Sequence, residues 1–128
     1  MSSKAAGLLA LLFLAHFLGD FTPLATERMQ QAKRVGRPLW PIASHALVHA
    51  ILVGLVVVLV AGSALVVVLA AVAIEFSTHL LLDWWKGSVS RRHPALGDPA
   101  QPGFWRTMGV DQLAHALVLV GIGWLVLV

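Results

Sequence analysis

The sequence has 128 residues, of which 59% are hydrophobic and only 12% are charged. A soluble domain is usually ~45–50% apolar and ~25% charged, so this composition excludes an ordinary soluble domain and indicates an integral membrane protein. The chain carries a formal net charge of +3 and has no cysteine, which excludes disulfides, thiolate metal ligands and cysteine nucleophiles.

Four apolar stretches have about the length of 20 residues that a helix needs to cross a membrane. The predicted spans cover residues 4–21, 41–61, 63–85 and 108–128. The first span resembles a signal peptide, but His16 and Asp20 near its end favour a retained helix. We therefore predict an all-α, antiparallel four-helix transmembrane bundle that forms a single domain over residues 1–128.

Three connections join the predicted spans. Residues 61–63 predict a tight hairpin between the second and third spans. The connection of residues 22–40 contains a predicted short helix over 26–35, which begins at a threonine and is closed by Gly36. The connection of residues 86–107 is rich in proline and glycine and is predicted to be irregular.

Basic residues are concentrated in the two longer connections. Eight of the nine lysines and arginines lie there, and Lys4 lies on the other side. The positive-inside rule therefore predicts that both long connections are cytoplasmic and both termini periplasmic, in a bacterial inner membrane. Membrane lipids are the expected partners, with anionic headgroups at the basic connections. Nucleic-acid binding is not expected, because the charges lie close to the membrane, and a homo-oligomer stays open.

Each predicted span carries histidine and carboxylate side chains spaced by four residues, which places them on one helix face. They are His16 and Asp20, His45 and His49, Glu75, His79 and Asp83, and Asp111 and His115. An isolated ionisable group at the centre of a membrane helix costs at least ~2.5–3.5 kcal/mol, so nine such groups require compensation. In an up-down-up-down bundle all nine fall at one depth, in the cytoplasmic half.

Histidines and carboxylates gathered at one depth indicate a transition-metal site. Nine groups exceed one tetrahedral shell, so we predict one or two divalent ions, with Zn favoured and Mn or Fe as alternatives. The preferred ligands are His45, His49, His79 and Asp83. A second ion, or the orientation of the first set of ligands, is assigned to His16, Asp20, Asp111 and His115. Glu75 is the deepest carboxylate and the predicted general base.

Four segments resemble those of a family of small bacterial inner-membrane proteins of unknown function, and the resemblance covers nearly the whole chain. These segments are HFLGD (16–20), SHALVH (44–49), EFSTHLLLDWWK (75–86) and DQLAH (111–115). The THLLLD segment is also similar to one in inner-membrane proteins described as metal-dependent hydrolases. This shorter resemblance implies metal-dependent hydrolysis, and its matching positions are His45, His49, His79 and Asp83.

Three classes of function are open. The preferred one is a membrane-embedded, metal-dependent hydrolase that acts on a lipid or lipid-linked phosphate. The second is a component for divalent-cation or proton transport, although an apolar half of the bundle gives no continuous polar path. The third is a structural membrane subunit, in which the polar groups fix the helix register. A bis-His haem protein is a variant that leaves the carboxylates unexplained.

Overall fold

A computed structural model describes residues 2–128 of the protein, and no strand occurs among them. The helices are α1 (Ser3–Phe21), α2 (Glu27–Val35), α3 (Leu39–Val56), α4 (Leu65–Arg92) and α5 (Pro102–Leu127). Four of them, α1, α4, α5 and α3 with its continuation to Ala61, are long and apolar enough to cross a membrane. The predicted all-α bundle with four candidate membrane spans is therefore confirmed.

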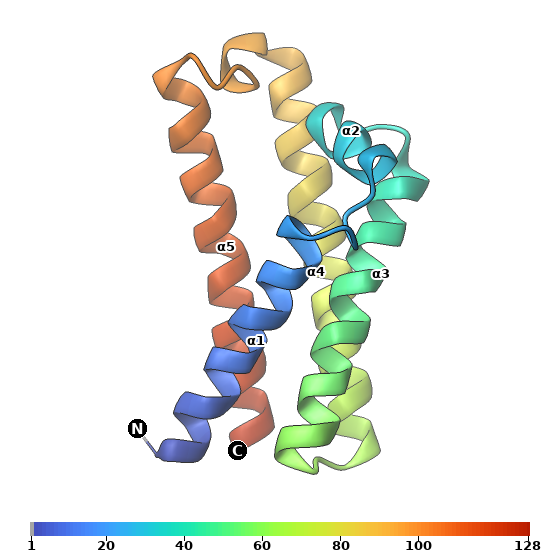
Figure 1. The fold of residues 1–128 in the computed structure, drawn as a ribbon, viewed down its shortest axis with the longest axis vertical. Helices are drawn as coiled ribbons and strands as arrows, with labels where there is room; N and C mark the ends of the chain where they lie inside the picture. The colour runs from blue at the N-terminus through green and yellow to red at the C-terminus, as the bar shows by residue number, and fades with distance from the viewer. Residues whose placement is uncertain (1) are drawn as a thin grey trace.

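The four long helices run up and down along the molecule, and the short helix α2 lies beside α3 and α4 at one end (Figure 1). Both chain termini lie at the opposite end, together with the turn between α3 and α4 (Figure 1). We call the end with α2 and the connection of residues 93–101 the basic end, because eight of the nine lysines and arginines belong to it. This arrangement places the four helix segments that carry polar pairs at similar depth.

Helices α4 and α5 extend beyond the apolar stretches that predict them. The expectation of irregular structure over residues 86–107 is wrong, because only residues 93–101 lie outside these two helices. The 28 residues of α4 measure ~42 Å, more than a ~30 Å hydrocarbon core, so its last turns can carry Lys86, Arg91 and Arg92 beyond the apolar region. The hydropathy pattern thus locates the edge of the apolar region and not the end of the helix.

The short helix and the hairpin follow from local sequence signals. The hydroxyl of Thr26 accepts a hydrogen bond from the backbone N–H of Met29 and caps α2 at its start. Gly36 ends α2 in the left-handed conformation, at a φ of 68°. After α3, a π-helical turn over Val57–Ala61 leads to Gly62, which is also left-handed and reverses the chain. Both predictions are confirmed.

Buried side chains change character along the bundle. The half away from the basic end has an apolar core, formed by Leu8, Leu12, Val53, Val57, Val68, Ala71, Leu119 and Ile122. Toward the basic end the buried residues are mainly polar. Large apolar side chains such as Leu59, Leu65 and Val66 are instead exposed on the outer surface, as expected where helices face lipid. These features support a membrane protein with a polar interior near one end.

Candidate metal centre

All nine predicted polar residues are buried, and we call this set the polar layer. Their exposed fractions are 9% or less for His16, Asp20, His45, His49, Glu75, His79, Asp83, Asp111 and His115. The remaining histidine, His93, is exposed at the end of α4. The four long helices therefore bring together every side chain that the sequence analysis assigned to the site.

His79 lies at the centre of the five imidazole rings. Its ring centroid lies 3.8 Å from that of His49, 4.4 Å from that of His115 and 5.2 Å from that of His45. The centroid of His16 follows at 5.6 Å. Rings packed this closely do not favour a porphyrin held between two of them, so the geometry speaks against the haem variant.

Three groups of side chains each place one potential ligand atom per residue within 4.8 Å of one another. The deep group is His16, His49, Glu75 and His79; the outer group is Asp20, His45, His49 and His79; the third group is His79, Asp83 and His115. All three contain His79. Because the groups share His79, they cannot bind three ions that each have their own set of ligands.

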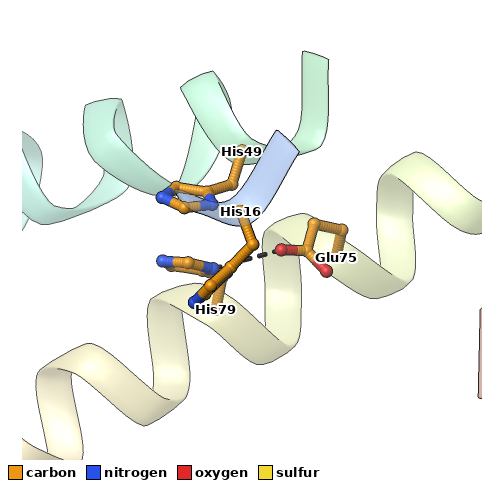
Figure 2. A group of neighbouring side chains, drawn as sticks. All are labelled: His16, His49, Glu75 and His79. Carbon is orange, nitrogen blue, oxygen red and sulfur yellow. Dashed lines mark hydrogen bonds and ion pairs between the residues drawn. The ribbon is translucent and has the colours of Figure 1, made fainter. Parts of the chain in front are cut away.

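The deep group draws its members from α1, α3 and α4, and their side chains face one another (Figure 2). Glu75 and His79 are one turn apart on α4, and Nδ1 of His79 lies 3.1 Å from Oε1 of Glu75. An ionised carboxylate only accepts hydrogen bonds, so this contact places the proton on Nδ1 and leaves a lone pair on Nε2. A carboxylate that orients a histidine in this way is a recurring feature of metal centres.

A glycine on α1 allows the deep group to close. A Cβ atom at Gly19 would lie 2.5 Å from Cε1 and Nε2 of the His49 ring. Such a contact is too short for any side chain, so only glycine lets the imidazole of His49 approach the backbone of α1. The position of His49 beside His16 therefore depends on a residue that offers no ligand itself.

Many ligand atoms of the polar layer have no well-aligned partner. Within residues 2–128, the buried Nε2 atoms of His16, His49, His79 and His115 make no hydrogen bond. Nε2 of His16 and Nε2 of His49 lie 3.3 and 3.6 Å from oxygens of Asp20, close enough for attraction but poorly directed. A buried polar atom without a hydrogen bond costs ~1–3 kcal/mol, and one metal ion could satisfy several lone pairs at once. The residues present therefore fit a metal.

His115, like His79, uses its Nδ1 atom in a hydrogen bond and leaves Nε2 without one in the described chain. Its Nδ1 donates to the backbone carbonyl of Asp111 at 2.8 Å, which leaves the lone pair on Nε2. Asp111 itself is paired through its side chain with Lys86, at 2.9 Å. On α5, His115 can therefore bind an ion through Nε2, and the charge of Asp111 is offset by Lys86.

Two lysines that the sequence analysis assigned to membrane topology and lipid headgroups reach into the polar layer. Nζ of Lys33 lies 2.7 Å from Oδ1 of Asp20 and 3.3 Å from Oδ2 of Asp83. Although burial acts in the opposite direction, the Asp83 and Asp20 carboxylates raise the pKa of Lys33 above its ordinary value, so it stays charged. Lys86 could have been found from the sequence, since it continues the stripe of His79 and Asp83 on α4. No sequence signal marks Lys33.

A cavity of about 360 Å³ lies at the basic end, between the polar layer and the connection of residues 93–101. Its charged lining residues are Asp20, Asp83, Asp111, Lys33, Arg34 and Lys86. The three carboxylates balance the three cations, so the formal charge of the lining is zero. A divalent cation bound beside these carboxylates would therefore make the cavity electropositive.

Comparison with known protein families identifies the chain. The model of a family described as "Protein of unknown function (DUF3307)" matches residues 8–128. The chain belongs to this family. The match includes the whole polar layer, and it confirms the resemblance to an uncharacterised family. No curated protein and no solved structure matches the chain, so the similarity to metal-dependent hydrolases gains no support.

Proposed function

We propose that this protein is a membrane-embedded metal-binding protein, and that it uses the metal to hydrolyse a lipid or lipid-linked phosphate. The observation that carries the proposal is the set of three ligand groups that share His79. Six buried imidazole nitrogens without hydrogen bonds in the described chain, four of them Nε2 atoms, support the same conclusion. Apolar residues would fill a purely structural layer at lower cost.

The deep group is the preferred position for the ion. It combines three histidines with one carboxylate, a donor set that suits Zn, with Mn or Fe as alternatives. Within residues 2–128, the polar contacts of Lys33 are with Asp20, His45 and Asp83, all outside the deep group. A cation in the deep group would therefore meet the least competition from the protein's own ammonium groups.

The cavity at the basic end supports a phosphate substrate. The lining has no net charge, so a divalent cation in the neighbouring deep group would make the cavity electropositive, and Arg34 and Lys86 on its wall could contact phosphate oxygens. His16, His49, Glu75 and His79 would hold the ion, which would supply an activated water for hydrolysis. In the hydrolysis, the water oxygen would join phosphorus, the phosphorus bond to the lipid oxygen would break, and the lipid oxygen would take up the proton that the water loses. The headgroup would enter from the membrane edge.

A phosphate-release assay tests the proposed reaction. Protein in vesicles that contain a lipid phosphomonoester should release inorganic phosphate; a chelator should abolish the release and added zinc should restore it. Zinc entry into the vesicles without phosphate release would instead assign the protein to transport. The apolar core around Leu12, Val57 and Leu119 gives no polar path through the other half, so we expect no such entry.

We also propose that the protein lies in a bacterial inner membrane with its basic end in the cytoplasm. The eight basic residues at that end support this orientation, and they would contact anionic lipid headgroups. A reporter fused after Val128 should therefore read as periplasmic, and one inserted in residues 93–101 as cytoplasmic. The reverse pattern would overturn the orientation and move the cavity to the other face of the membrane.

A further inference from the structure

The ammonium group of Lys33 sits among atoms that could bind a metal. Its Nζ lies 2.7 Å from Oδ1 of Asp20, 2.8 Å from Nε2 of His45 and 3.3 Å from Oδ2 of Asp83. Nε2 of His45 also lies 3.0 Å from Oδ1 of Asp20, so its tautomer decides whether it accepts from the ammonium of Lys33 or donates to that carboxylate. Two carboxylate oxygens and an imidazole nitrogen converge on this one positive charge.

The partners of Lys33 overlap with the candidate metal groups. Asp20 and His45 belong to the outer group, and Asp83 belongs to the third group. The contact with Asp83 is an ion pair by distance, and Oδ2 of Asp83 has no aligned hydrogen bond in the described part of the chain. The single ammonium therefore offsets one of the two negative charges of Asp20 and Asp83, and it does not donate an aligned hydrogen bond to every oxygen around it.

Helix α2 holds Lys33 firmly in this position. A Cβ atom at Gly87 on α4 would collide with the backbone of Gly36 and Lys33, so the two helices touch backbone to backbone. Arg91 donates to the carbonyl of Val35 at 2.8 Å and fixes the end of α2 on α4. The lysine is thus delivered by an anchored helix, with its side chain 14% exposed.

We infer that the Lys33 ammonium takes the place of a second divalent ion. The polar layer then holds one metal ion, in the deep group, while the protein's own cation fills the outer group. This inference rests on the proposed metal binding at His79 and narrows its stoichiometry from one or two ions to one. It explains how a layer with enough ligands for two ions is neutralised when only one is bound.

Zinc stoichiometry in the purified full-length protein tests the inference. Wild-type protein should bind one ion. Lys33→Met should bind two, because without the ammonium Asp20 and His45 are free to bind a zinc ion from solution. Arg28→Met is the matched control: it removes another cation of α2, one that lies 4.1 Å from the centre of the Trp40 ring and outside the polar layer, and the variant should still bind one ion. Equilibrium titration with zinc and elemental analysis provide the counts.

A second variant withdraws Lys33 without deleting its charge. Gly87→Ala should push the end of α2 away from α4 and also raise the count to two. Its control is Gly121→Ala, where the described residues leave open space for a Cβ atom, and the count should stay at one. This variant decides the question if Lys33→Met does not fold.

The possible counts separate the two proposals. One ion in wild type and one in both test variants would overturn the role of Lys33 and leave metal binding intact. Two ions in wild type would also overturn it, since the ammonium would then not exclude an ion. Zero ions in wild type and in every variant would overturn the metal centre itself.

Discussion

Replacing His79 by alanine is expected to remove bound metal from the protein. His79 is the one residue common to the deep, outer and third groups, so its loss disrupts all three whichever of them is occupied. The affinity should fall by more than the ~10–100-fold expected when a residue that only orients a ligand is lost. Elemental analysis after purification, followed by zinc titration, measures the change.

The matched control for His79→Ala is His93→Ala. His93 is exposed outside the polar layer, so its loss should leave metal content unchanged. Metal-dependent stability gives a second reading, because a ligand at 100 times its Kd stabilises the folded state by ~2.7 kcal/mol. Wild type and His93→Ala should gain thermal stability on zinc addition, and His79→Ala should not. Equal metal content in both variants would refute a centre built around His79.

The convergence of the polar layer could be predicted from the sequence for a simple reason. Spacing of four residues fixes which side chains share a helix face, and the alternating direction of the spans fixes their depth. His16 near the end of one span and His49 near the start of the next must then lie at similar height. No knowledge of side-chain packing is required for this step, and the structure places both in the deep group.

The grouping of ligands within the layer depends on contacts that spacing does not reveal. The sequence analysis separated Glu75 from the ligands as a general base, whereas the structure places it with His16 and His49. This grouping depends on the rotation of each helix and on the close approach of His49 to Gly19. Neither property has a periodic signature in the sequence.

The contact of Lys33 with the polar layer was not predicted, because it depends on how α2 packs against α4. The sequence pattern predicts the helix that carries it but does not predict that this helix docks on α4. Docking depends on Gly36 and Gly87, two glycines 51 positions apart in the numbering, which allow backbone contact. A basic residue in a connection usually sets topology, and here the fold gives the same charge a second role inside the layer.

Replacing Glu75 by glutamine is expected to lower metal affinity while the protein remains folded. The amide keeps the size of the side chain and one acceptor oxygen for Nδ1 of His79, 3.1 Å away in the wild type (Figure 2). It removes the negative charge that binds the ion or strengthens His79 as a ligand. The expected loss is ~10–100-fold in zinc affinity. The chain's other glutamate, Glu27, is exposed on α2, so Glu27→Gln is the matched control and should change nothing.

The same variant distinguishes three roles of Glu75, because each predicts a different pair of readings. A metal-binding or histidine-orienting role predicts weaker zinc binding, together with lower phosphate release that excess zinc partly restores. A general base predicts normal zinc binding with phosphate release abolished at every zinc concentration, because the amide cannot accept a proton. A purely structural layer predicts neither change, and removal of a buried charge would then leave thermal stability equal or higher.

Since Glu75 lies in the deep group and outside the lining of the cavity, we expect the first pattern, weaker zinc binding with partial rescue by excess zinc. Normal zinc affinity in Glu75→Gln would overturn that expectation, and the phosphate-release assay would then decide between base and scaffold.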